Sequence, residues 1–184
     1  MSYSCKNLVV GCGNILFKDD GFGPRVIEAL NEYFADKEMP EDTKFVDGGV
    51  GAPQYIFSLP DPSWEKVIVI DALEFNGEPG ELRIYSPNNM VINEYGGAHA
   101  VPLDQSLLTL TRMGVEVVIV GCKLKEVTEP DVVIGLSEEV EAAIPKAVEM
   151  VLEQLDYKKW IFSIKKMFIK KCEKTFKKRV TLKN

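Results

Sequence analysis

The chain has little of the chemistry on which most zinc-dependent and thiol-dependent proteins rely. Its 184 residues include a single histidine, His99, and four cysteines without a CxxC pair: Cys5, Cys12, Cys122 and Cys172. A structural zinc site or a disulfide framework is therefore not expected, and this cysteine usage is typical of a reducing cytoplasm. The lone histidine also excludes a zinc peptidase of the HExxH kind, which needs two.

Long apolar runs and several familiar catalytic motifs are also missing. No apolar run approaches the roughly 20 residues of a membrane span. The first thirteen residues lack the charged region and cleavage site of a signal peptide, so we expect a cytoplasmic protein. The sequence contains neither the GxSxG turn of α/β-hydrolases nor a Walker lysine motif.

Charge divides the chain into two parts. The net charge is −6, but residues 156–184 carry eleven Lys and Arg against two acids, and residues 1–155 carry the remaining acidic excess. The acidic balance argues against nucleic-acid binding. We therefore expect an α/β domain over residues 1–155 and a separate basic tail over residues 156–184.

The basic tail has the pattern of an amphipathic helix. Apolar residues recur every four positions, at Trp160, Ile164, Phe168, Cys172, Phe176 and Val180. Such a stripe packs on the parent domain or on a second copy, while a lysine-rich face also suits an acidic partner or an anionic membrane surface. The tail contains no histidine and only isolated acids, so we do not expect it to carry chemistry.

Hydrophobic periodicity in the first 155 residues predicts alternating strands and helices. Strands are expected at 7–11, 44–47, 66–70, 80–85 and 115–120, and helices at 21–34, 53–59, 102–113 and 138–155, the last with Ser137 as N-cap. This order predicts a three-layer α/β sandwich with a mostly parallel, doubly wound sheet of about five strands and helices on both faces. The first strand should lie between the second and third.

Three residues with metal-binding side chains should meet at one edge of this sheet. Asp20 follows the first strand, Asp71 follows the third, and His99 precedes a helix on the same side. Ligands of doubly wound folds bind at the carboxyl ends of the strands, and one imidazole with two carboxylates suits a divalent transition metal. Taken singly, Asp20 is also explained as a helix N-cap, Asp71 as a polar strand end and His99 as a surface residue.

The glycine-rich loop over residues 11–23, GCGNILFKDDGFG, invites a nucleotide-binding interpretation. The dinucleotide fingerprint requires a third glycine where this chain has Leu16. Asp19 and Asp20 also place negative charge where a phosphate would need positive charge. The sequence therefore argues against a nucleotide cofactor.

Several separate blocks of sequence resemble the hydrogenase maturation endopeptidases, which trim the C-terminus of nickel–iron hydrogenase large subunits. The blocks are GCGNILFKDDGFGPRVIEAL at 11–30, DGG at 47–49, VIVIDAL at 67–73, GGAHAVPL at 96–103 and IGLSEEVEAAIPKAVEMVLEQL at 134–155. They occur in the family's order and span residues 6–155. The form DDGFGP is most similar to members that serve archaeal deazaflavin-reducing hydrogenases.

The resemblance implies an endopeptidase that removes a C-terminal extension from the nickel-loaded large subunit precursor. It implies that Asp20, Asp71 and His99 contact nickel brought by the substrate, and that Asp20 and Asp71 are catalytic, with an aspartic and a metal-assisted mechanism both open. Many members carry Glu in place of Asp20, so the carboxylate here lies about one methylene further back. Further candidate site residues are Asp19, Asp47, Gly48 and Gly49.

Two other functions fit the same residues. A non-catalytic nickel-checking or metal-carrier protein would use the same trio without cutting a peptide, and a nucleotide-binding regulator would use the glycine loop. Cys12 lies near the predicted site, but free cysteines are mostly buried, so we expect it to be a small packing residue and not a nucleophile.

Overall fold

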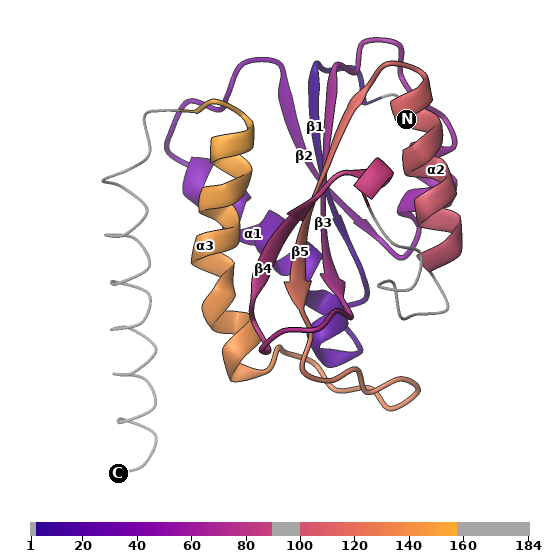
Figure 1. Ribbon diagram of the computed structural model, residues 1–184. Coiled ribbons are helices and arrows are strands. Elements are labelled where there is room, and N and C mark those ends of the chain that lie inside the picture. The colour runs from indigo at the N-terminus through magenta and orange to yellow at the C-terminus, as the bar shows by residue number, and fades with distance from the viewer. Residues whose placement is uncertain (1–2, 90–99, 158–184) are drawn as a thin grey trace.

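A computed structural model describes residues 3–89 and 100–157. Within these residues the chain forms three layers, with α1 and α3 on one face of a sheet and α2 on the other (Figure 1). The predicted residues His99 and 158–184 lie outside the described part. Within that part, no helix is both long and apolar enough to cross a membrane.

Five strands form one mixed sheet in the order β2-β1-β3-β5-β4. The parallel strands are β1 (Asn7–Cys12), β2 (Thr43–Gly49), β3 (Lys66–Leu73) and β5 (Glu116–Lys123). The edge strand β4 (Leu82–Tyr85) runs antiparallel to β5. This arrangement confirms the predicted doubly wound fold, with β1 between β2 and β3.

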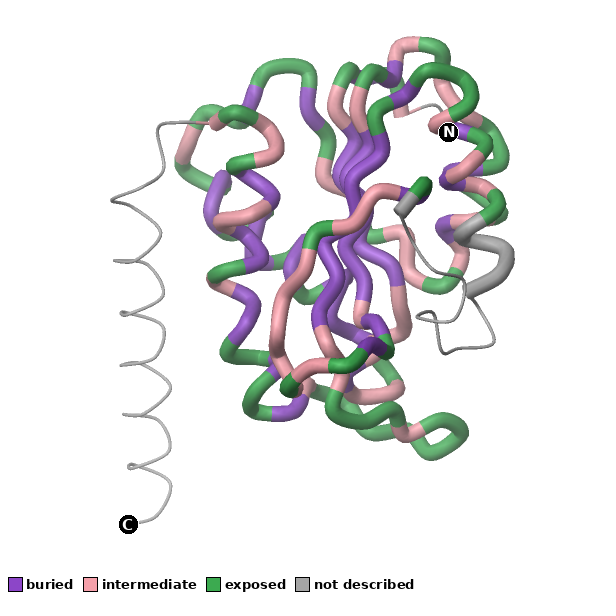
Figure 2. Tube along the Cα trace, viewed as in Figure 1, coloured by how far each residue is buried: buried purple, intermediate pink, exposed green. Residues whose placement is uncertain are grey.

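Helices cover both faces of the sheet and divide the core into two clusters. The helices are α1 (Phe22–Phe34), α2 (Ala100–Arg112) and α3 (Glu138–Gln154), with short turns η1 (Lys18–Gly21), η2 (Pro53–Phe57) and η3 (Pro87–Asn89). One cluster joins α1 and α3 to the sheet, and the other joins α2 and η2 to its opposite face. The central strands are accordingly buried along most of their length (Figure 2).

All four parallel strands continue past their predicted ends, and β3 and β5 do so by three residues each. β3 extends to Leu73 and β5 to Lys123, because Asp71 pairs with Gly121 and the next two residues of each strand also pair. The prediction that Asp71 is the first residue beyond its strand was therefore wrong. Pairing of β3 with β1, however, ends at Gly11 and Ile70, so Asp71 is the first residue of β3 that has no partner on β1.

Ser137 occupies the N-cap position of α3 but does not cap the helix with its side chain. Its backbone is extended there (φ −62°, ψ 157°), as an N-cap requires. Its hydroxyl instead donates a hydrogen bond of 2.9 Å to Oδ2 of Asp19. The prediction that Ser137 is the N-cap residue is confirmed, but a carboxylate 118 residues away in the chain accepts its hydroxyl hydrogen bond.

The first turn of α1 lies directly against the ends of β1 and β3. A Cβ atom at Gly23 would lie 2.3 Å from the carbonyl oxygen of Cys12 and 2.4 Å from that of Ile70. A Cβ atom at Gly11 would in turn lie 2.5 Å from the carbonyl oxygen of Gly23. Only glycine permits this approach of helix and sheet backbone, which fixes where the chain leaves β1 and enters α1.

The end of α3 is held by one further residue. The Tyr157 ring packs edge-on against Phe34, with ring centroids 5.4 Å apart, and its hydroxyl donates to the carbonyl oxygen of Glu38. The packed domain therefore includes Tyr157, two residues past the predicted boundary at residue 155.

Candidate carboxylate site

Asp20 is placed by the loop that follows β1. It lies in the short turn η1, half-buried, and its Oδ2 accepts a hydrogen bond of 2.8 Å from the backbone N–H of Asn14. The same N–H lies 3.1 Å from the Asp20 carbonyl oxygen. The N-cap residue of α1 is Gly21 and has no side-chain cap. The interpretation of Asp20 as a helix cap is therefore wrong, and its side chain is held by the loop itself.

Asp71 extends from β3 at the point where pairing with β1 has ended. Its side chain is buried, with 9% of the residue exposed. Its Oδ1 accepts a hydrogen bond of 2.8 Å from the backbone N–H of Ala72. A buried carboxylate is costly unless donors or cations compensate its charge, so this position is unfavourable for packing alone.

The two carboxylates interact electrostatically. Burial and, after it, the negative charge of Asp20 raise the pKa of Asp71 from 3.8 to about 8, although the hydrogen bond from the Ala72 N–H opposes the shift. At neutral pH the protonated form of Asp71 is therefore well populated. A carboxyl group that titrates near neutral pH can donate and accept a proton at working pH.

Cys12 shows that a third carboxylate lies in the same region. Burial raises the pKa of the Cys12 thiol well above its ordinary value, and the charges of Asp71, Asp47 and Asp20 add to the effect, in that order. The thiol is therefore not ionised at neutral pH and is a poor nucleophile. The structure confirms the prediction that Cys12 is a buried packing residue, and it brings Asp47 near Asp20 and Asp71.

The DGG block ends β2 beside the glycine loop. Asp47 is exposed, and its Oδ1 accepts a hydrogen bond of 3.0 Å from the N–H of Gly49. The carbonyl oxygen of Gly49 accepts one of 3.3 Å from the N–H of Gly13. Gly48 packs closely, since a Cβ there would lie 2.7 Å from Val10 Cγ1. Both glycines thus shape the backbone, and only Asp47 presents a functional group.

The structure describes two of the three predicted metal-contacting residues. Asp20 and Asp71 are brought together at the carboxyl ends of β1 and β3, and His99 lies outside the described residues. Over residues 3–89 and 100–157, no three His, Cys, Asp or Glu side chains are grouped closely enough to hold a metal ion by themselves. The described site is therefore a carboxylate pair.

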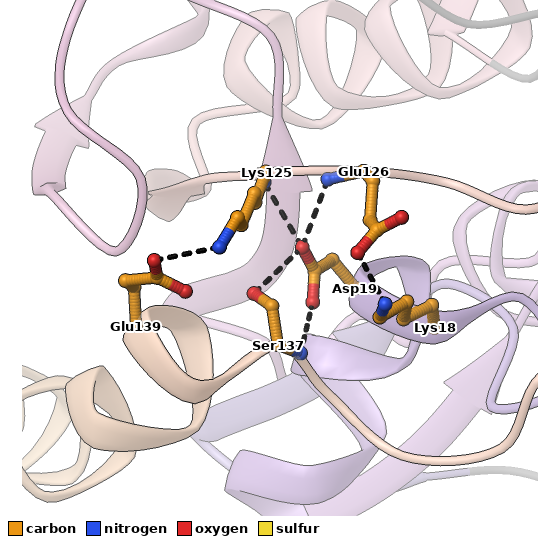
Figure 3. A network of polar contacts seen from close by, with 6 residues as sticks. All are labelled: Lys18, Asp19, Lys125, Glu126, Ser137 and Glu139. Atoms are coloured by element: carbon orange, nitrogen blue, oxygen red, sulfur yellow. Dashed lines mark hydrogen bonds and ion pairs between the residues drawn. The ribbon is translucent and has the colours of Figure 1, made fainter.

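Asp19 has a different role from its neighbour Asp20. It is fully buried, and its carboxylate accepts four hydrogen bonds (Figure 3). The donors are Ser137 N–H (2.6 Å), Ser137 hydroxyl (2.9 Å), Lys125 N–H (2.9 Å) and Glu126 N–H (3.0 Å). Asp19 therefore ties η1 to the loop after β5 and to the start of α3. Sequence reasoning placed it only as a candidate site residue beside Asp20.

Ion pairs surround this buried carboxylate. Lys18 forms an ion pair with Glu126, and Lys125 forms one with Glu139 at 2.7 Å (Figure 3). The segments that Asp19 joins by hydrogen bonds are therefore also joined by ion pairs. Such exposed pairs contribute little stability individually. The buried hydrogen bonds of Asp19 are the main polar link between the segments.

Comparison with known proteins agrees with this fold. The profile of the family described as hydrogenase maturation protease matches residues 24–154. The chain is 48% identical over 159 residues to the coenzyme F420 hydrogenase subunit delta of Methanothermobacter thermautotrophicus, covering 86% of this chain and all of that protein.

Solved structures of hydrogenase-processing peptidases share the fold. The hydrogenase maturating endopeptidase HybD of E. coli superposes with a TM-score of 0.67 at 28% identity, over 82% of this chain and 92% of that one. A hydrogenase 2 maturation peptidase from a Thaumarchaeota archaeon superposes with a TM-score of 0.55 at 31% identity, over 83% and 99%.

The structure therefore defines a doubly wound α/β protein with a carboxylate pair at the carboxyl ends of β1 and β3. The chain belongs to the hydrogenase maturation protease family, whose members are endopeptidases that process the C-terminus of nickel–iron hydrogenase large subunits. The predicted family and activity class are thereby confirmed.

Proposed function

We propose that this chain cleaves one peptide bond near the C-terminus of a nickel-loaded hydrogenase large subunit precursor, and that the hydrogenase is of the F420-reducing, deazaflavin-dependent kind. Family membership makes a hydrogenase large subunit the substrate class. The F420 specificity is supported by the 48% identity to a protein named for the F420 hydrogenase over nearly the whole domain.

One observation carries the chemical part of the proposal. Asp71 is buried, is not charge-compensated by a described cation, and has its pKa raised by that burial and by the charge of Asp20. A divalent cation that binds there stabilises such a pair, because its positive charge compensates both carboxylates. A carboxylate pair that is destabilised alone and stabilised by an incoming ion suits a protease that recognises a metal in its substrate.

The residues present fit nickel as part of the substrate. Carboxylate oxygens and a histidine nitrogen are suitable ligands for a divalent transition metal. Asp20 and Asp71 supply the two carboxylates, and we propose His99 as the nitrogen ligand. Nickel held by both the precursor and this trio would fix the precursor's C-terminal segment against the carboxyl ends of β1 and β3.

The cleavage step requires a water molecule and a proton acceptor. Water adds to the scissile carbonyl carbon, a carboxylate of the pair takes the water proton, and that proton passes to the leaving amine as the C–N bond breaks. We propose Asp20 and Asp71 for this proton transfer, because a carboxyl group with a pKa of about 8 can both accept and return a proton at neutral pH.

The test is cleavage of a purified precursor, with and without nickel, followed by mass measurement of the product. The nickel-loaded precursor should be shortened and the nickel-free precursor should not. Prior treatment of the protease alone with a chelator should leave its activity unchanged, because the substrate supplies the ion. Stoichiometric, tightly bound nickel or zinc in the isolated protease would instead indicate a conventional metallopeptidase.

The same assay separates the non-catalytic alternative. A nickel-checking or carrier protein would bind the loaded precursor, or remove its nickel, without changing the precursor's mass. A shortened precursor excludes that alternative.

A further inference from the structure

Exposed apolar side chains are concentrated beside the carboxylate site. In the part of the chain that the structure describes, half of the large exposed hydrophobic residues lie in two loops, the one after β1 and the one between β5 and α3. Five of these six residues are Ile15 (50%), Leu16 (40%), Val132 (62%), Val133 (40%) and Ile134 (76%). We call these five residues the apolar rim. Scattered exposed apolar residues need no explanation, but a concentration of them marks a binding surface.

The two loops of the apolar rim are joined backbone to backbone. Phe17 and Val133 form a parallel bridge. The N–H of Val133 donates to the carbonyl oxygen of Leu16 at 2.9 Å, and the N–H of Lys18 donates to the carbonyl oxygen of Val133 at 2.9 Å. Segments more than 100 residues apart in the chain thus present their apolar side chains as one surface.

The buried Asp19 carboxylate fixes the position of the second loop of the apolar rim by hydrogen bonds. Its hydrogen bonds reach Lys125, Glu126 and Ser137, which flank the segment that carries Val132, Val133 and Ile134 (Figure 3). A surface that is ordered before binding loses less conformational entropy when its partner arrives. The apolar rim is therefore built as a preformed contact and is not an accident of a loose loop.

The apolar rim is continuous with the candidate active site. Ile15 follows Asn14, whose N–H holds the Asp20 carboxylate. The backbone of Gly21, directly after Asp20, also lies against Ile15, since a Cβ there would be 3.0 Å from the Ile15 Cα. A polypeptide whose scissile bond lies beside Asp20 must leave the site across neighbouring surface, and the apolar rim is such a surface.

We propose that the apolar rim binds an apolar segment of the hydrogenase large subunit precursor that flanks the scissile bond. The proposal rests on the proposed function, because it takes the precursor as the substrate. It assigns to Val132 and Ile134 a role in substrate affinity that is separate from the chemistry at Asp20 and Asp71.

The test measures KM and kcat for cleavage of the nickel-loaded precursor. Val132→Asp and Ile134→Asp should each raise KM by roughly tenfold, with kcat within about twofold of wild type, because solvent-exposed contacts at an interface act on binding. Ile134→Leu keeps the apolar surface and should keep KM within about twofold. Thermal melting should show that the variants are folded.

A matched control lies at the amino ends of the parallel strands, opposite the site. Met113, 59% exposed, precedes β5, so Met113→Asp introduces the same charge at a similarly exposed apolar position away from the site. Its KM should be unchanged. An unchanged KM in both rim variants, or an equal rise in Met113→Asp, would overturn the proposal. Failure of the wild-type chain to cleave the loaded precursor would instead overturn the proposed function.

Discussion

Asp19 and Asp20 are neighbours in the chain, but their carboxylates lie in different environments. Asp19 is fully buried and accepts four hydrogen bonds from fixed donors. Asp20 is half-buried, and burial together with the charge of Asp20 raises the pKa of a second carboxyl group, Asp71. The first arrangement compensates a negative charge with the protein's own donors. The second places one negative charge near another and leaves the pair able to respond to an incoming cation or proton.

The comparison teaches how structural and chemical acids differ within one loop. A carboxylate surrounded by N–H and O–H donors stabilises the fold, and its charge is already compensated without a bound ligand. A carboxyl group that titrates near neutral pH costs stability and is available for chemistry. Variants at Asp19, Asp20 and Asp71 should therefore separate stability from activity.

The largest expected effect is on cleavage by the carboxylate pair. Asp20→Asn and Asp71→Asn should each reduce kcat/KM for the nickel-loaded precursor about a thousandfold, because the amide cannot take a proton and is a weaker metal ligand. Circular dichroism should show an intact fold. The matched control is Asp36→Asn, an exposed acid after α1, which should cleave normally. Normal cleavage by both Asp20→Asn and Asp71→Asn would place the active site elsewhere.

The next effect is on stability and concerns Asp19. Asp19→Ala should lower the free energy of unfolding by about 3 kcal/mol, because four donors, two of them buried, lose their acceptor together. Ser137→Ala removes one of those donors and should cost only about 1 kcal/mol. Urea denaturation of the three proteins measures both values. A smaller loss in Asp19→Ala than in Ser137→Ala would show that Asp19 is not the centre of the network.

A third effect is the pH dependence of stability in the metal-free chain. The pKa of Asp71 is about 8 in the fold and 3.8 without it. Between these values the folded state binds more protons than the unfolded state, so the contribution of Asp71 to stability is lost as pH rises through this window. Asp71→Asn removes that loss.

The Asn variant should therefore be more stable than wild type at pH 8, by on the order of 2 kcal/mol. The difference should be smallest near pH 4, where Asp71 is protonated in the fold. Thermal melting of both proteins from pH 4 to 9 measures it. A difference that does not change with pH would contradict a raised pKa.

The smallest effect should come from removing the basic tail. A chain that ends after Tyr157 keeps the contact with Phe34 and should cleave the loaded precursor with kcat/KM within about twofold of wild type, because the tail carries none of the proposed catalytic groups. The truncation point follows Tyr157 because cutting at residue 155 would remove a packed side chain. A large rise in KM after truncation would assign the tail to substrate binding.

Local pattern was enough to predict most of the fold. The buried apolar runs of β1, β3 and β5 and the helical spacing in α1 and α3 predicted the layers and the position of β1 between β2 and β3. The ends of elements were less predictable. Asp71 looked like a strand end because it is charged, yet β3 continues because β5 supplies partners to Leu73. Pairing between strands distant in sequence leaves no local signal.

The part of the candidate site that depends only on the order of the strands was predictable. Two acids after β1 and on β3 must meet if β1 lies beside β3, and Asp20 and Asp71 do. The division of labour between Asp19 and Asp20 could not be predicted, because adjacent identical residues have the same local pattern. They differ only because Ser137 and the loop after β5, both distant in the chain, donate hydrogen bonds to Asp19.

The close contact between Gly11 and Gly23 has a consequence for the evolution and engineering of the family. At most packed positions a larger residue can be accommodated when a partner side chain becomes smaller. Here each added Cβ would meet backbone atoms, the Gly23 carbonyl in one case and the Cys12 and Ile70 carbonyls in the other. Neither position has a side chain to give up, so no exchange between the two can restore the fit. Homologues that lose either glycine must move the start of α1 away from the sheet, and the acid that precedes it must move as well.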